Sequence, residues 1–225
     1  MRKKDKVFII IPAYNEEKVI DGVIKGIKKE GFKNIVVVDD GSKDKTKSTA
    51  SKEKAVVLRH IINRGKGAAV KTGLEYAKLK KAEIAVTIDG DGQHNPKDIR
   101  KMIEKIERGY EIVLGSRFIK KKNKMPLFNR IANHIANILV FFIYNLWVSD
   151  SQSGFRAYSK KALEVINTKL DRYEFDSEVI REIAKNKLKF CEIPIDVFYT
   201  PYSISKKQKQ NLINGIKTLI KIIGY

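Results

Sequence analysis

Two aspartates, Asp89 and Asp91, lie two residues apart in the segment TIDGDGQHNP at residues 87–96. The apolar run AEIAVTI before them is typical of a buried strand. The segment PKDIRKMIEKI after them is typical of a helix, with Asn95 as its N-cap and Pro96 in its first turn. The pair is therefore predicted to lie on a strand-to-helix turn, where open α/β sheets bind ligands. Carboxylates there could hold a hard cation, Mg²⁺ or Mn²⁺, together with phosphate oxygens. Taken alone, the same residues also suit an ordinary Asp-Gly turn.

Three more loops follow strand-like runs in the same way: PAYNEE, VVDDGSKDKT and LGSRF. Because the carboxyl ends of parallel strands meet at one edge of a sheet, the four loops are predicted to converge on one site. A further segment, NRGKG, places Arg64 and Lys66 at a glycine-rich helix start, which can attract phosphate. A helix cap with a solvated lysine is the alternative for this segment.

The elements that must carry these loops alternate along the chain. Strands are predicted at residues 6–14, 33–42, 55–60, 83–92, 110–118 and 189–199. Helices are predicted at 15–31, 65–81, 96–109 and 175–187, and the segment 149–166 is predicted to end in a helix. Continuous apolar strands between helices indicate an α/β fold, with a mostly parallel central sheet and helices on both faces.

The composition fits a single domain with a short appendage, since the 225 residues are 43% hydrophobic and 32% charged. The formal net charge of +20 would attract nucleic acid, an anionic membrane or an anionic substrate. Most of the excess is lysine, which favours diffuse attraction. The single cysteine, Cys191, excludes an intrachain disulfide. No signal-peptide cleavage pattern follows the basic N-terminus, so a cytoplasmic location is expected.

Two segments are predicted to form amphipathic helices. Met125–Val148 carries one formal charge, Arg130, and the asparagines at 129, 133 and 137 form a polar strip. This helix is expected to lie on a membrane surface or to pack on the sheet. The tail Ser205–Tyr225 has five lysines, no acid and one apolar face; membrane binding and docking on the core are both open for it. The predicted division is a domain at 1–204, with the interfacial helix at about 125–148, followed by a basic amphipathic helix at 205–225.

Taken together, the motifs resemble those of the family 2 glycosyltransferases. Among these the sequence is most similar to polyprenyl-phosphate sugar transferases, of the dolichol-phosphate mannose synthase type and its glucosyl relatives. The segments that carry the resemblance are IIIPAYNEE, VVVDDGSKDKT, NRGKGAAVKTGLEYA, TIDGDGQHNP, VLGSRF and SQSGFRAY. The resemblance implies a GT-A (Rossmann-like) fold, a nucleotide-sugar donor, a divalent metal and an inverting transfer.

The resemblance also implies roles for individual residues. The nucleotide is expected to contact Pro12, Ala13, Tyr14, Glu16, Asp39, Asp40, Lys66 and Asp89. The metal, Mg²⁺ or Mn²⁺, is expected on Asp89, Asp91 and Gln93, with Asp91 as a catalytic residue. Phosphate groups of the donor or the acceptor are expected on Arg117, Arg130 and Arg156; a structural ion pair is the alternative for Arg156.

The need for a catalytic base depends on the acceptor. A polyprenyl phosphate is already anionic near neutral pH and can attack the sugar C1 without a strong base, whereas a sugar hydroxyl needs one. Asp150, just before SQSGFR, is the best candidate for that base, and Glu178 is the next. A polyprenyl phosphate is the expected acceptor, and a saccharide or glycan hydroxyl is the alternative. GDP-mannose and UDP-glucose are both open as donors.

A basic nucleic-acid-binding protein is the non-enzyme alternative. It is disfavoured because no nucleic-acid-binding module is recognisable and because the acidic loops would repel phosphate in the absence of metal. Many members of the family continue into transmembrane helices, whereas this sequence has no convincing span. The enzyme is therefore expected to bind an anionic membrane peripherally at its cytoplasmic face, or to use a membrane-protein partner.

Overall fold

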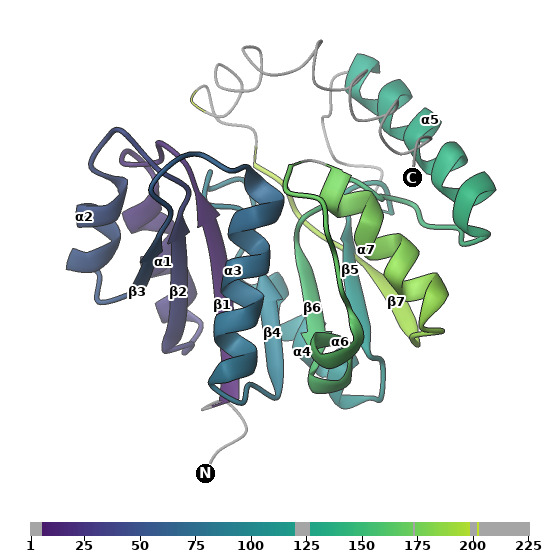
Figure 1. Ribbon diagram of the computed structural model, residues 1–225, viewed down its shortest axis with the longest axis horizontal. Coiled ribbons are helices and arrows are strands. Elements are labelled where there is room, and N and C mark those ends of the chain that lie inside the picture. Colours follow the sequence, from purple (N-terminus) through teal and green to yellow (C-terminus); the bar gives the residue numbers. More distant parts are fainter. Residues whose placement is uncertain (1–5, 120–126, 173, 199–201, 203–225) are drawn as a thin grey trace.

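The computed structural model describes residues 6–119, 127–172, 174–198 and 202 (Figure 1). The side chains of residues 127–132 and 136 are not part of this description. The predicted C-terminal helix at 205–225 lies outside the described residues.

Among the described residues, seven strands form one sheet in the order β3-β2-β1-β4-β6-β5-β7. Their bounds are β1 Val7–Ala13, β2 Asn34–Asp39, β3 Val56–Arg59, β4 Ile84–Thr87, β5 Ile112–Ser116, β6 Arg156–Ser159 and β7 Phe190–Pro194. All neighbours pair in parallel except β6, which runs antiparallel to both β4 and β5. The prediction of a mostly parallel α/β sheet is confirmed.

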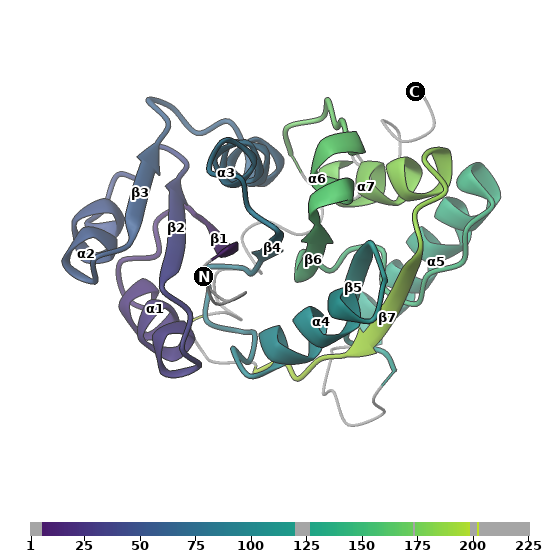
Figure 2. The same ribbon diagram turned by 90° about the horizontal axis from the view of Figure 1, so that it is seen from below.

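Helices cover both faces of this sheet. Their bounds are α1 Ile20–Lys29, α2 Thr46–Lys52, α3 Lys66–Leu79, α4 Asp98–Glu107, α5 Leu127–Tyr144, α6 Lys160–Val165 and α7 Glu174–Lys185. Figure 2 shows α1 and α4 on one face and α3, α6 and α7 on the other. The molecule therefore has three layers, with the sheet in the middle.

The residues of β1 show how the core is divided between the two faces. Ile9 and Ile11 point into one apolar cluster, which contains Ile24 of α1. Ile10, between them, points into the other cluster, which contains Val179 of α7. All three isoleucines are fully buried. Because both faces of the central strands are covered, these strands read as continuous apolar runs in the sequence.

The structure corrects the predicted elements in three places. The first helix was expected from residue 15, but α1 begins at Ile20. Asn15 has a positive φ of 53°, and its amide donates to Ser42 Oγ at 2.9 Å. The segment before α1 is therefore a loop that is hydrogen-bonded to the loop after β2. Helix α2 and strand β6 were not predicted. The sequence of α2, TKSTASK, lacks an apolar period, and β6 has only four residues.

Helix α5 buries Asn133 and Asn137 against the protein. Asn137 is 3% exposed; its side chain donates to the Ser149 carbonyl oxygen at 2.7 Å and accepts from the Ser151 amide at 3.0 Å. Several exposed positions of α5 and of the residues after it are apolar, and Phe142 and Trp147 are 78% and 52% exposed. Among the described helices, none has both the length and the apolar character needed to cross a bilayer.

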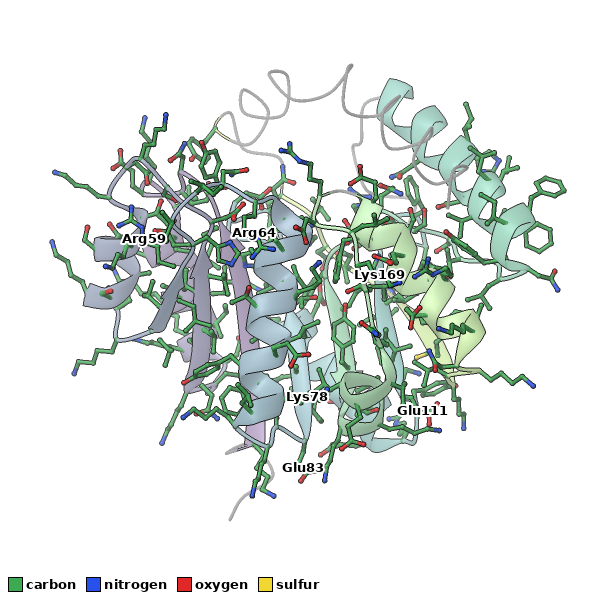
Figure 3. All side chains as sticks on the ribbon, viewed as in Figure 1. Arg59, Arg64, Lys78, Glu83, Glu111 and Lys169 are labelled. Carbon is green, nitrogen blue, oxygen red and sulfur yellow. The ribbon has the colours of Figure 1, made fainter. Side chains whose placement is uncertain are left out.

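Strands β1, β2, β4 and β5 all point in the same direction, because β6 runs antiparallel to both of the strands it joins. The loops after these four strands therefore meet at one edge of the sheet, which we call the carboxyl edge. Figure 3 shows Arg64 toward this edge, whereas Lys78, Glu83 and Glu111 lie toward the opposite edge.

Candidate active site

The turn after β4 carries Asp89 and Asp91. The Gln93 amide donates to Asp91 Oδ1 at 3.0 Å, and Gly92 between them has a φ of 74°, a conformation that glycine adopts without steric cost. The predicted helix start was slightly early. Asn95 Oδ1 accepts from the Lys97 amide at 3.1 Å within this turn, and α4 begins only at Asp98.

Both carboxylate oxygens of Asp89 are engaged by other side chains of the site. Lys66 Nζ lies 2.9 Å from Oδ1, and His94 Nε2 lies 3.3 Å from Oδ2. The His94 ring packs against Phe155 with a centroid separation of 5.0 Å. Burial by itself would raise the pKa of Asp89, but the charge of Lys66 and the hydrogen bond from His94 hold that pKa far below its usual range. Asp89 is therefore an anion at any physiological pH.

Lys66 extends from the first turn of α3 and lies between two acids. Besides Asp89, its Nζ is 3.6 Å from Asp176 Oδ2, and Asp176 is in turn 3.6 Å from Arg156 Nη2. Burial would lower the pKa of Lys66, but the charges of Asp176 and Asp89 raise it above its ordinary value. The site thus holds alternating charges in the order acid, lysine, acid, arginine.

The two acids after β2 hold the neighbouring loops. Asp39 is buried; its Oδ1 accepts from the Ser42 amide at 2.9 Å, and its Oδ2 lies 3.3 Å from Arg59 Nε. Asp40 Oδ2 accepts from the Gly65 amide at 2.7 Å. Its Oδ1 accepts from the Arg64 amide at 3.0 Å and from His60 Nδ1 at 2.7 Å. Asp40 therefore fixes the chain immediately before Lys66.

The loop after β1 is closed by a residue distant in sequence. Pro12 and Ala13 are the last residues of β1, and Tyr14 is half-buried beside them. Glu16 is buried, and its amide donates to Thr46 Oγ1 at 2.7 Å. The Tyr202 hydroxyl lies 3.0 Å from Glu16 Oε2 and 3.1 Å from the Asn15 carbonyl oxygen. Burial and the charge of Glu16 raise the pKa of Tyr202 above its ordinary value, so its hydroxyl remains protonated.

Arg117, one residue after β5, is paired with Asp150. Asp150 Oδ2 accepts from the Arg117 amide at 3.0 Å and from its Nε at 2.7 Å, and Oδ1 accepts from Nη2 at 2.7 Å. The Asp150 side chain is completely buried, whereas Arg117 is 13% exposed. Both oxygens of this acid are thus occupied by one guanidinium group.

Two further arginines, Arg156 and Arg130, were predicted to bind phosphate. Arg156 is buried, and its guanidinium donates to the carbonyl oxygens of Ser153, Ser151 and Asp176 at 2.8–2.9 Å. Its Nη2 also lies 3.6 Å from Asp176 Oδ1, and a phosphate-binding role for Arg156 stays a prediction. Arg130 belongs to α5, but its side chain lies outside the described part of the chain.

Glu178, the second candidate base, also has partners within the protein. Its Oε2 accepts from the amides of Lys169 and Leu170 at 2.9 and 2.8 Å, and its Oε1 accepts from Arg181 at 2.8 Å. Glu178 therefore holds the loop before α7 in place.

Sequence reasoning missed four residues of the site: His94, Gly154, Asp176 and Tyr202. His94 adjoins the acidic turn in TIDGDGQHNP, and Asp176 stands two residues before Glu178 in FDSE. Gly154 belongs to SQSGFRAY, where only the arginine drew attention. Tyr202 lies beyond every recognisable motif, so its contact with the first loop had no signal in the sequence.

The turn after β4 fits a metal ion that a ligand helps to coordinate. Within the described residues, no group of three or more His, Cys, Asp or Glu side chains is arranged to hold a metal ion. An all-protein metal cage is therefore not formed there. Asp89, Asp91 and Gln93 instead offer oxygen atoms from a single turn, and a hard cation is often held by one or two carboxylates together with substrate phosphates.

Comparison with known proteins gives the family of this chain, and with it the class of enzyme. The chain belongs to Glycosyl transferase family 2, whose profile matches residues 8–166. It is 47% identical to an uncharacterised protein of Methanocaldococcus jannaschii, over 98% of this chain and 92% of that protein. It is 38% identical to the UDP-N-acetylglucosamine–dolichyl-phosphate N-acetylglucosaminyltransferase of Methanococcus voltae, over 96% of this chain and 94% of the relative.

The fold also matches solved structures. One is the glucosyl-3-phosphoglycerate synthase of Mycobacterium tuberculosis, crystallised with Mn²⁺, uridine diphosphate and glucosyl-3-phosphoglycerate. Its TM-score is 0.69 at 18% identity, and the match covers 94% of this chain and 78% of that one. The predictions of a family 2 glycosyltransferase and of a GT-A fold are both confirmed.

Proposed function

We propose that this enzyme transfers a sugar from a nucleotide-sugar donor to a polyprenyl phosphate, with inversion at the sugar C1. The name of the Methanococcus voltae relative supports a lipid-phosphate acceptor and makes UDP-N-acetylglucosamine the first donor to test. The motifs alone favoured GDP-mannose or UDP-glucose, and these remain the competing donors. UDP-N-acetylglucosamine is placed before the other two donors because this relative is 38% identical along nearly the whole chain.

The donor is proposed to bind at the carboxyl edge with a divalent metal. Asp89, Asp91 and Gln93 would hold Mg²⁺ or Mn²⁺ together with the diphosphate. When bound, the metal supplies Lewis-acid stabilisation of the leaving nucleoside diphosphate. Lys66, 2.9 Å from Asp89, is placed to bind a diphosphate oxygen at the same location. The first loop, closed by Tyr202 on Glu16, is proposed to contact the nucleotide as well.

The observation that carries the choice of acceptor is the state of the two candidate bases. Asp150 has both oxygens bound to Arg117, and Glu178 has both oxygens bound to the loop before α7 and to Arg181. A carboxylate occupied in this way is poorly placed to take a proton from a sugar hydroxyl. An acceptor that is already anionic removes the need for that step. Arg117 would then bind the acceptor phosphate, and Asp150 would position Arg117.

Peripheral membrane binding at the cytoplasmic face is proposed because a polyprenyl phosphate resides in a bilayer. Apolar side chains on and just after α5 face outward, among them Phe142 and Trp147, and Ile61 after β3 is 99% exposed at the carboxyl edge. The net charge of +20 would add attraction to anionic lipids. The basic segment 205–225 and a membrane-protein partner are further proposed contributors.

A screen of donor and acceptor pairs tests this function. The purified enzyme would be incubated with Mn²⁺, radiolabelled UDP-N-acetylglucosamine, UDP-glucose or GDP-mannose, and either a short polyprenyl phosphate or a saccharide acceptor. We expect label in the lipid fraction from UDP-N-acetylglucosamine. Transfer to the saccharide with none to the lipid phosphate would contradict the proposed acceptor, and transfer from GDP-mannose alone would contradict the proposed donor.

A further inference from the structure

The contact between Lys66 and Asp89 depends on a glycine. A Cβ atom at Gly154 would lie 2.3 Å from Lys66 Nζ and 3.2 Å from Asp89 Oδ1, so only glycine leaves room for the ammonium group. The loop is also fixed in place, since Thr87 Oγ1 at the end of β4 donates to the Gly154 carbonyl oxygen at 2.7 Å. Arg156 holds the Ser153 carbonyl oxygen from the other side at 2.8 Å. The lysine therefore lies against Asp89 because the backbone is built to admit it.

This contact places a protein cation on the oxygen that a metal ion needs. Lys66 occupies Oδ1 of Asp89, and His94 occupies Oδ2. A divalent cation that binds Asp89 therefore competes with these two groups for the carboxylate charge. If the cation arrives alone, the half-buried ammonium group loses part of its attraction to Asp89 while a second positive charge enters beside it. If the cation arrives with a diphosphate, the ligand brings new anionic oxygens for Lys66.

Asp176 keeps the displaced lysine within the site. Its Oδ2 lies 3.6 Å from Lys66 Nζ, and its side chain is 5% exposed. Within the described residues its Oδ1 has no hydrogen-bond partner, although Arg156 Nη2 lies 3.6 Å from it, and Lys66 faces Oδ2. A small movement of Nζ toward Asp176 would therefore free Asp89 Oδ1 without expelling the lysine into solvent.

We infer that Lys66 is an internal counter-ion that disfavours binding of a free divalent cation at Asp89 until a nucleoside diphosphate enters the site. This inference rests on the proposed donor and metal site. It adds that metal and nucleotide bind in a strongly coupled manner and that Lys66 is the origin of the coupling. Because coupling between two ligands is reciprocal, the metal raises the affinity for the diphosphate by the same factor as the diphosphate raises the affinity for the metal.

The test measures binding of Mn²⁺ without any turnover. Electron paramagnetic resonance of free Mn²⁺ would give the dissociation constant for the wild type and three variants, each with and without UDP. Lys66→Met removes the counter-ion. Gly154→Ala retains the lysine but forces Nζ away from Asp89. Lys78→Met is the matched control, since Lys78 is on the same helix at the opposite edge of the sheet, and its ion-pair partner among the described residues is Glu75 at 4.0 Å (Figure 3).

For the wild type we expect UDP to tighten Mn²⁺ binding by about tenfold or more, the scale of one charge-assisted hydrogen bond. Lys66→Met and Gly154→Ala should bind Mn²⁺ alone about tenfold or more tightly than the wild type, with a smaller effect of UDP. Lys78→Met should behave as the wild type. Thermal unfolding of each variant would confirm that it is folded. If Lys66→Met does not fold, Gly154→Ala still tests the inference.

Three results would overturn the inference, and they differ in what else they affect. If both site variants bind Mn²⁺ alone as weakly as the wild type, yet all bind it with UDP, Lys66 is not the counter-ion and the proposed function stands. The same conclusion follows if the wild type binds Mn²⁺ equally well with and without UDP. If the wild type binds no Mn²⁺ even with UDP, the metal site of the proposed function fails together with the inference.

Discussion

Replacing Asp150 with asparagine should destabilise the enzyme and weaken acceptor binding, because the buried Asp150 orients Arg117. Asp150 accepts three hydrogen bonds from Arg117, at 3.0, 2.7 and 2.7 Å. Asparagine keeps only one acceptor oxygen, so at least one donor would face an amide NH₂ group. Losing one charge-assisted hydrogen bond costs about 1.5–3 kcal/mol, and breaking a buried ion pair costs about 3–5 kcal/mol.

We expect the free energy of unfolding to fall by about 3 kcal/mol, where these two ranges meet, because Arg117 retains some exposure to solvent. For a chain of this size, such a loss lowers the melting temperature by about 6–12 °C. Steady-state kinetics with a short polyprenyl phosphate should show a raised acceptor KM and little change in kcat, since Arg117 would lose its orientation. Asp171→Asn is the control. Asp171 also pairs with an arginine, Arg64, but its side chain is 37% exposed, so a loss below about 1 kcal/mol is expected.

The opposite pattern would refute this reasoning. An unchanged melting temperature, an unchanged acceptor KM and a fall of about 10²–10⁴-fold in kcat would identify Asp150 as a general base. The acceptor would then be a hydroxyl, and Arg117 would not be the residue through which Asp150 acts.

Three further changes test other parts of the site. Asp91→Ala should abolish transfer with an unchanged melting temperature, as should EDTA for the wild type; activity of this variant in EDTA would contradict the metal assignment. Phe142→Asp should weaken flotation with anionic vesicles by about tenfold, since it removes an aromatic side chain from the proposed membrane face. Leu79→Asp is the control, because Leu79 is equally exposed but lies on the opposite edge, and we expect it to leave flotation unchanged. If both variants weakened flotation equally, the proposed membrane face would be wrong. Tyr202→Phe should raise the dissociation constant for UDP by about 2–10-fold, because it removes one hydrogen bond to Glu16; calorimetry showing no change would separate Tyr202 from the nucleotide site.

The sequence alone determined the layered fold and the position of the acidic turn. Apolar runs such as FIIIP and IVVV are buried on both faces, and this burial leaves a direct trace in the residue types. Asp89 and Asp91 could be placed at a strand end because strand, turn and helix each have local signals. Such signals depend on residues that are neighbours in the chain, and they therefore survive without knowledge of the tertiary structure.

Elements with weak local signals were decided by their surroundings. Strand β6 is four residues long and gains its hydrogen bonds from β4 and β5, so it forms only where those strands leave a gap between them. In α5 the sequence predicted an amphipathic helix but not the direction of its polar strip. That direction follows from Ser149 and Ser151, which give Asn137 partners on the protein side.

The roles of the charged residues were decided only by the tertiary structure. Asp150 and Arg117 were each predicted as separate site residues, but their pairing depends on how the loop after α5 returns to the end of β5. Lys66, Asp89 and Asp176 come from three elements that are far apart in the chain, and their mutual distances fix which charge neutralises which. A sequence shows which side chains can carry charge. The choice of partner is made by distance and burial, because electrostatic interactions become strong only where the fold brings charges together away from water.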